Sequence, residues 1–256
     1  MALLNCRFFS ETLKESTTMT VILPESAEGQ IGMEQAATQG KPPVLYLLHG
    51  LSDDDSIWLR RTSIERYVAE LGLAVVMPRG GRSFYANEYL GQNYWDYVSQ
   101  ELPDMVASMF NVSTAREDTF VAGLSMGGYG AFKLALNHPD RFAAAASLSG
   151  ALDVAHSEAM LRLRQEVPQV WGSQGPNPLT DDLIALAQTA QPEALPRLYQ
   201  VCGTEDFLYQ DNVTFAEVAA QRGISLESHL DGPGDHDWGF WDTKIRDVLN
   251  WLPLRK

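Results

Sequence analysis

Five short apolar runs constrain the fold of this 256-residue chain more than any other feature. They span residues 44–50, 73–78, 118–123, 142–149 and 198–203. A continuous apolar run of this length is typical of a strand that is buried on both faces of a sheet, as in parallel sheets covered by helices.

Segments with a helical repeat of apolar residues alternate with these runs. They span residues 57–70, 94–110, 126–137, 212–222 and 240–252. Pro103 interrupts the second segment, which predicts either a kinked helix or two pieces with Pro103 in the first turn of the second piece. The alternation of strand and helix predicts an α/β fold with a mostly parallel central sheet and helices on both faces.

Two regions near the N-terminal end depart from this alternation. Residues 3–13 and 18–23 look like two strands joined by a polar turn, without a crossover helix, so we expect them to be antiparallel additions at one edge of the sheet. Residues 24–43 are rich in Gly, Gln, Glu and Pro and predict a loop, to which the sequence assigns no role.

A later region interrupts the alternation as well. Residues 151–196 carry five prolines with short helical pieces between them. We interpret this region as an insertion over the carboxyl end of the sheet and not as a separate domain. Residues 225–230 alternate like a final strand. Residues 1–256 are therefore expected to form a single domain.

The charge balance limits the partners. Nineteen Lys and Arg residues against 33 Asp and Glu residues give a formal net charge of −14, which argues against nucleic acid and anionic membranes as partners. Residues 1–17 lack the pattern of a signal peptide, and the longest charge-free apolar stretch, residues 142–152, is too short to span a bilayer. With only Cys6 and Cys202, expected to be reduced and buried, a cytoplasmic location is the expectation.

The most informative motif joins the strand at residues 118–123 to the helix at residues 126–137. It reads Gly123-Leu-Ser125-Met-Gly127, the pattern G-x-S-x-G. A turn from a buried strand directly into a helix strains its central residue, and the neighbours at −2 and +2 must be small. The motif alone also occurs in ordinary turns, but the strand before it and the helix after it favour Ser125 as a nucleophile, with the Met126 N–H aimed at a developing oxyanion.

A serine nucleophile needs a base and an acid, which follow in the chain order Ser, Asp, His in folds with this turn. His236 lies in a glycine-rich loop between the last strand and the last helix, where this order requires the base. The other four histidines lie too early in the chain, at a helix end, in the insertion, or within a strand: His49, His138, His156 and His229.

The acid is expected just after the strand at residues 198–203. Asp206 is the first choice there and Glu205 the second. A second oxyanion donor is expected from the loop that follows the strand at residues 44–50, where the backbone N–H of Leu51 is the candidate. Gly50 allows the chain to turn there without a side chain in the way.

Aromatic residues near these motifs are candidates for the substrate pocket. Trp238 follows the base by two residues and is expected to reach the mouth of the site, and Trp58 is a further candidate. The insertion is expected to add an apolar wall made of Leu161, Leu163, Val167 and Trp171. A small walled pocket favours acyl chains of about two to four carbons, because creating room for further methylenes costs about 1–3 kcal/mol.

Several longer motifs resemble the tributyrin-esterase branch of the esterase D (S-formylglutathione hydrolase) group of α/β-hydrolases. GLSMGGYGAFKLAL contains Ser125, CGTEDFLYQDN contains Asp206 and DHDWGFWD contains His236, and the likeness runs from about residue 3 to residue 252. The resemblance implies an α/β-hydrolase fold, a triad of these three residues, and short-chain acyl esters as substrates. It also implies no cofactor and frequent homo-oligomers, and we expect no metal site.

The leading hypothesis is therefore a serine carboxylesterase. The same residues suit an S-formylglutathione thioesterase, and Arg60, Arg61, Arg79 and Arg82 offer a local positive patch for an anionic conjugate despite the acidic chain. Acyl transfer to an alcohol differs only in the access of the acceptor. A non-catalytic binding module is the alternative from another class, although a binder does not need Ser, His and Asp together.

Overall fold

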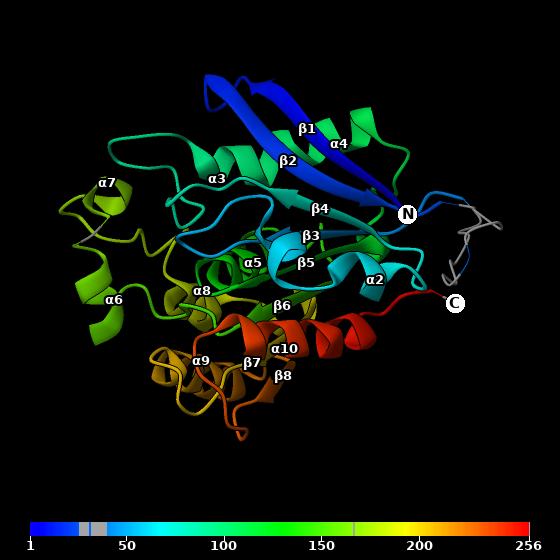
Figure 1. The fold of residues 1–256 in the computed structure, drawn as a ribbon. Coiled ribbons are helices and arrows are strands. Elements are labelled where there is room, and N and C mark those ends of the chain that lie inside the picture. Colours follow the sequence, from blue (N-terminus) through cyan, green and yellow to red (C-terminus); the bar gives the residue numbers. More distant parts are fainter. Residues whose placement is uncertain (26–30, 32–39, 166, 256) are drawn as a thin grey trace.

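One eight-stranded sheet forms the centre of the computed structural model, which describes residues 1–25, 31, 40–165 and 167–255 (Figure 1). The strand order is β1-β2-β4-β3-β5-β6-β7-β8. The strands are β1 (Ala2–Ser10), β2 (Glu15–Leu23), β3 (Val44–Leu48), β4 (Ala74–Pro78), β5 (Thr119–Leu124), β6 (Ala144–Leu148), β7 (Arg197–Val201) and β8 (Leu226–His229).

The pairing of the strands confirms the predicted sheet. β1 pairs antiparallel with β2, and β2 pairs antiparallel with β4, while all the other neighbours are parallel. Every residue of β3, β4, β5 and β6 is buried, as the continuous apolar runs predict. The parallel strands therefore bring their carboxyl ends to one edge of the molecule.

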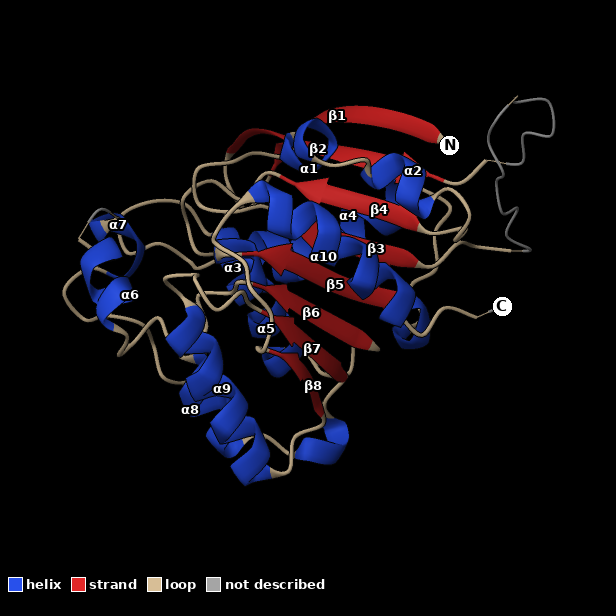
Figure 2. Cartoon of the chain, turned by 60° about the horizontal axis from the view of Figure 1, so that its bottom comes forward, coloured by secondary structure: helices blue, strands red, loops and turns tan. Residues whose placement is uncertain are grey.

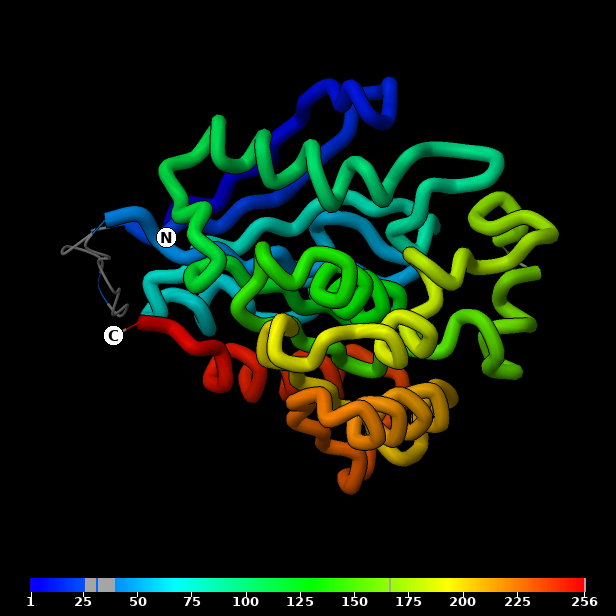
Figure 3. The backbone as a smooth tube through the Cα atoms, turned by 180° about the vertical axis from the view of Figure 1, so that it is seen from behind, coloured from blue at the N-terminus to red at the C-terminus, as the bar shows by residue number. Residues whose placement is uncertain are grey.

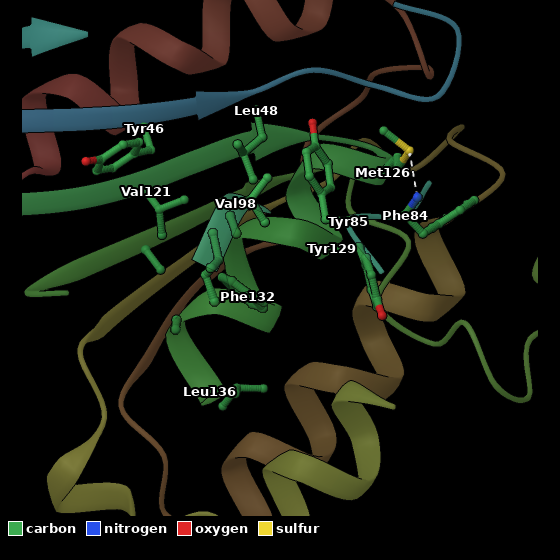
Figure 4. Close-up of a cluster of buried hydrophobic side chains, with 14 of the residues drawn as sticks. Tyr46, Leu48, Phe84, Tyr85, Val98, Val121, Met126, Tyr129, Phe132 and Leu136 are labelled. Carbon is green, nitrogen blue, oxygen red and sulfur yellow. Dashed lines mark hydrogen bonds between the residues drawn. The ribbon is translucent and has the colours of Figure 1, made fainter. Parts of the chain in front are cut away.

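Helices cover both faces of the sheet (Figure 2). α1 (Ile57–Arg61), α2 (Ile64–Val68) and α10 (Trp238–Trp251) pack on one face. The other face and its surroundings hold α3 (Tyr94–Asp96), η1 (Tyr97–Glu101), α4 (Leu102–Met109), α5 (Met126–Asn137), α8 (Leu183–Thr189) and α9 (Tyr209–Arg222), and Figure 3 shows α5, α8 and α9 side by side there. The buried aromatic side chains of α5 contact its neighbours: Phe132 packs on Phe215 of α9, and the Tyr129 hydroxyl donates to the Asp181 carbonyl just before α8 (Figure 4 shows Phe132 and Tyr129).

The helix predicted at residues 57–70 is two helices in the structure. The Thr62 hydroxyl donates to the Trp58 carbonyl at 2.6 Å and accepts from the Ile64 N–H at 3.1 Å. Such side-chain bonds compete with the helical pattern, so α1 ends and α2 begins around Thr62. Around Pro103 the chain stays helical, with the wider π-helical turn η1 just before α4 and Pro103 in the first turn of α4.

The region at residues 151–196 contains α6 (Glu158–Leu163), α7 (Pro168–Trp171), α8 and the 3-10 turn η3 (Pro192–Ala194). Only α6 and α7 lie beyond the carboxyl ends of the parallel strands (Figure 1). α8 packs on α5 instead. The loop predicted at residues 24–43 lies largely outside the described residues.

Two further expectations concern the whole chain. Both cysteines are free, but only Cys202 is buried, because Cys6 lies on the edge strand β1 and is half-buried. Within the described ranges, no helix combines the length and the apolar character needed to cross a membrane.

Candidate active site

Ser125 lies between β5 and α5 in a strained backbone conformation, with φ 53° and ψ −118°. A Cβ on Gly123 would lie 2.4 Å from the backbone carbonyl carbon of Gly127, and a Cβ on Gly127 would lie 2.5 Å from the Leu48 carbonyl oxygen. Both contacts involve backbone that cannot move aside. Glycine is therefore required on each side of the serine, which explains the G-x-S-x-G pattern physically.

A continuous hydrogen-bonded chain links Ser125, His236 and Asp206. His236 Nε2 lies 3.0 Å from Ser125 Oγ, and His236 Nδ1 lies 3.0 Å and 2.9 Å from the two carboxylate oxygens of Asp206. Because a carboxylate only accepts, Nδ1 carries the proton and Nε2 is left to accept the proton of the serine hydroxyl. The three residues come from separate loops at the carboxyl edge of the sheet.

The structure distinguishes the two candidate acids. Asp206 is 4% exposed. Burial alone raises its pKa, but the hydrogen bond and charge of His236, together with the Leu208 N–H, outweigh burial and lower the pKa below the ordinary value of a carboxyl group. Glu205 is exposed and accepts a hydrogen bond from the Gly234 N–H at 2.6 Å, so it braces the loop before His236 and does not contact the imidazole.

Two aromatic side chains hold the imidazole of His236. The Trp241 ring packs edge-on against the imidazole, with the two ring centroids 4.8 Å apart. The Trp241 indole N–H donates to Ser149 Oγ at 3.1 Å. Phe207 lies 4.6 Å from the imidazole on another side and is 58% exposed. Phe207 is not among the residues predicted from the sequence, although its place directly after Asp206 is a signal that it lies beside the base.

Both predicted oxyanion donors lie next to Ser125. Met126 is the first residue of α5, and a Cβ built on Gly50 would lie 3.7 Å from the Cβ of Ser125, which places the Gly50–Leu51 peptide beside the serine. Within the described part of the chain, neither the Leu51 N–H nor the Met126 N–H donates a hydrogen bond. Two backbone donors are therefore available near the hydroxyl.

The three candidate pocket tryptophans differ in position. Trp238 is partly exposed, but it is the first residue of α10 and so does not precede the helix as expected. Trp58 is 1% exposed, and its indole N–H donates to the Leu48 carbonyl at 3.1 Å. This corrects the prediction for Trp58, which is a core residue whose ring supports Trp238 edge-on at 5.3 Å.

The predicted wall from the insertion is formed only in part. Leu161 points away from the core and is 45% exposed, whereas Val167 and Trp171 are buried. Trp171 packs on Phe84 at 5.1 Å. The Phe84 N–H in turn donates to Met126 Sδ at 3.3 Å (Figure 4). Trp171 is thus linked to the residue after Ser125 through Phe84, which was not among the residues predicted from the sequence.

A second buried carboxyl group lies near the acid loop. Asp211 is 3% exposed, and its Oδ2 atom has no hydrogen-bond partner among the described residues. Burial, reinforced by the charge of Asp153, raises the pKa of Asp211 to about 7. Between about pH 4 and pH 7, Asp211 therefore holds a proton in the folded protein, whereas an exposed aspartate is ionised.

We expect Asp211 to make the protein less stable as the pH rises. The folded state keeps the proton up to about pH 7, whereas the unfolded chain releases it near pH 4, so the free energy of unfolding falls between these values. Asp211→Asn stays neutral and should raise the free energy of unfolding at pH 8 by about 1–3 kcal/mol, with little change at pH 4. Urea titrations at both pH values measure this, and equal stability of the two proteins at pH 8 would contradict it.

Comparison with known proteins decides the family. A model of the Esterase family ("Putative esterase") matches residues 10–252. The chain belongs to this family. An acetyl esterase of Caldicellulosiruptor saccharolyticus is 30% identical over 270 aligned residues, which cover 98% of each chain.

Two solved structures from Staphylococcus aureus are similar over the full length. The fluorophosphonate-binding serine hydrolase FphF, with substrate bound, has a TM-score of 0.85 and 35% identity, covering 100% of this chain and 99% of that chain. The S-formylglutathione hydrolase FrmB has a TM-score of 0.80 and 36% identity, covering 98% of each chain. The fold of this esterase is therefore the α/β-hydrolase fold, and the protein is a serine carboxylesterase that acts on a small-molecule ester.

Proposed function

We propose that this esterase hydrolyses short-chain acyl esters with Ser125 as nucleophile, His236 as general base and Asp206 as the acid that orients the base. The observation that carries this assignment is the continuous chain of hydrogen bonds from Ser125 Oγ through the imidazole to the Asp206 carboxylate. Residues 1–256 then act as one domain, with residues 151–196 as its insertion.

The geometry leads to a two-step reaction. His236 Nε2 accepts the Ser125 proton while Oγ attacks the ester carbonyl, and Asp206 stabilises the imidazolium. The imidazolium then protonates the departing alcohol, which leaves an acyl-enzyme. Water, deprotonated by the same imidazole, attacks the acyl carbon and frees the acid. In both steps the N–H groups of Leu51 and Met126 bind the oxyanion.

The nucleophile is tested by covalent labelling. A fluorophosphonate should add one phosphonyl group per chain, on the peptide that contains Ser125, because Oγ displaces fluoride from phosphorus and His236 takes the proton. Intact mass and peptide mapping measure this. A label on another residue, or no label on active protein, would contradict the assignment.

We expect activity to be highest on acyl chains of about two to four carbons and to fall steeply by about eight. This expectation is supported by the packing beside Met126, where Phe84 and Trp171 are buried against each other, because each added methylene in a filled space costs about 1–3 kcal/mol. The measurement is kcat/KM for nitrophenyl esters from acetate to laurate. A kcat/KM that rises from butyrate to laurate would indicate an open groove and contradict the closed pocket. It would leave the assignment of the triad unaffected.

A second candidate is the hydrolysis of S-formylglutathione. Arg60, Arg61 and Arg79 line a surface cavity of about 390 Å³ together with Asp53 and Asp54, directly after the loop that carries Leu51. Mixed charges suit a leaving group that bears carboxylates and an ammonium group. If this is the natural substrate, Arg60→Ala should raise KM for S-formylglutathione and leave KM for nitrophenyl acetate unchanged.

We also propose a location and a set of partners for this esterase. A cytoplasmic protein is supported by the two free cysteines, and a protein that binds no nucleic acid and no membrane is supported by the net charge of −14. A homo-oligomer and acyl transfer to an alcohol are compatible with this site. A non-catalytic binding module is set aside, because the chain belongs to an esterase family.

A further inference from the structure

His49 follows β3 directly, is 1% exposed and takes no part in the chain from Ser125 to Asp206. Its ring makes two short contacts. Nδ1 lies 2.7 Å from the Gly50 carbonyl oxygen, and Nε2 lies 2.8 Å from the Gly80 backbone nitrogen. A carbonyl only accepts and a backbone N–H only donates, so Nδ1 carries the proton and Nε2 has none. His49 is therefore a neutral imidazole with a defined tautomer.

The surroundings keep the ring neutral and in place. Burial lowers the pKa of His49, against the opposing effects of the Gly50 carbonyl and the nearby Asp54 and Asp55. A proton on Nε2 would face the Gly80 N–H, donor against donor. The Tyr85 hydroxyl also donates to the His49 carbonyl at 2.9 Å, so the backbone that carries the ring is held as well.

The bond to Gly50 fixes one particular peptide. The Gly50 carbonyl oxygen accepts both the His49 Nδ1–H and, at 3.2 Å, the Asp53 N–H. In a planar trans peptide the N–H points opposite to the C=O, so holding the Gly50 oxygen sets the direction of the Leu51 N–H. We propose that His49 is a positioning residue that aims the Leu51 N–H into the oxyanion hole by clamping the Gly50–Leu51 peptide. This inference rests on the proposed function, because it requires Leu51 to bind the oxyanion.

The backbone on the Gly80 side of the His49 ring is held by buried contacts of its own. Tyr85, with a positive φ of 47°, is fully buried, and its carbonyl accepts from Lys133 Nζ at 3.0 Å. Lys133 also pairs with Asp181 at 2.6 Å. The loop at residues 80–85 therefore has little freedom to follow a displaced peptide, so loss of the His49 clamp is expected to act on the Gly50–Leu51 peptide itself.

Three substitutions separate the two ring contacts. In His49→Asn the side-chain amide N–H takes the place of Nδ1–H and can still donate to the Gly50 carbonyl. In His49→Gln the amide oxygen reaches toward the Gly80 N–H, but no donor stands at the Nδ1 position. His49→Leu removes both contacts. The Asn variant therefore keeps the clamp, and the Gln and Leu variants lose it.

We expect kcat on nitrophenyl acetate to fall about 10²-fold in the Gln and Leu variants, as for loss of one oxyanion donor, and to stay within about tenfold in the Asn variant. KM should change less than about threefold. The inhibition constant of a trifluoromethyl ketone, which forms a tetrahedral adduct with the serine, should rise in proportion to the loss of kcat. Rescue by Asn and this proportionality are readouts that a purely structural role would not produce.

His229→Gln is the matched control, because His229 is an exposed histidine at the end of β8 and should keep kcat within about twofold. Urea unfolding monitors the fold of each variant, and the polar Asn and Gln pair decides the result if the Leu variant does not fold. The proposal is overturned if Gln keeps wild-type kcat, if Asn falls as far as Gln, or if kcat falls while the inhibition constant stays the same. Loss of activity in Ser125→Ala together with any of these results would reject only the role of His49, whereas an active Ser125→Ala would reject the proposed function.

Discussion

Ser125→Ala is expected to lower kcat by more than about 10⁴-fold while leaving the fold intact. The substitution removes one oxygen whose hydrogen-bond partner is His236, and it leaves Gly123 and Gly127 to accommodate the tight turn. Only binding and the oxyanion donors then remain, which together give about 10³–10⁴-fold over the reaction in water. Steady-state kinetics with nitrophenyl acetate, together with a thermal unfolding scan, measure both effects.

Ser16→Ala is a suitable control for this experiment, because Ser16 is exposed on β2 and takes no part in the site. It should leave kcat within about twofold. A Ser125→Ala protein that keeps more than roughly a tenth of the wild-type kcat would mean that another group is the nucleophile.

The tight turn that carries Ser125 can be predicted from the sequence, because it is a local feature. The strand, the turn and the helix around Ser125 are contiguous, and the two glycines are needed for steric reasons that involve neighbouring backbone. The parallel order of the central strands also follows from local patterns, since continuous apolar runs that alternate with helices leave few other topologies.

Residues whose roles depend on contacts across the fold could not be predicted in this way. Trp58 was expected in the pocket, but its ring lies in the core, where the Leu48 carbonyl accepts its N–H. His49 comes too early in the chain to be the base in the order Ser, Asp, His. Its role as a positioning residue depends on a contact with Gly80, 31 residues away, which the sequence does not reveal. Phe84 approaches Met126 across 42 residues. The periodicity of apolar residues gives no information on contacts between residues so far apart in the sequence.

The choice between Glu205 and Asp206 also depends on a contact that the sequence does not reveal, although here the contact lies within one loop. Both carboxylates follow β7 and both satisfy the required chain order. What separates them is the direction of the loop, since the Leu208 N–H donates to Asp206 Oδ1 at 2.8 Å and turns this side chain inward, while Glu205 stays at the surface. One hydrogen bond within the loop thus decides which neighbour reaches the imidazole.

Asp206→Asn should lower kcat/KM by about 10³–10⁴-fold, close to the effect of losing the base itself. The carboxylate only accepts, so it keeps the His236 proton on Nδ1, whereas the amide of asparagine can donate to Nδ1 and leave the proton on Nε2, facing Ser125 Oγ. That tautomer cannot accept the serine proton. Kinetics on nitrophenyl acetate measure the loss, and Glu205→Gln is the matched control, because Glu205 bonds only to the loop and should cost less than about tenfold. A crippled Glu205→Gln beside a mild Asp206→Asn would reverse the assignment of the acid.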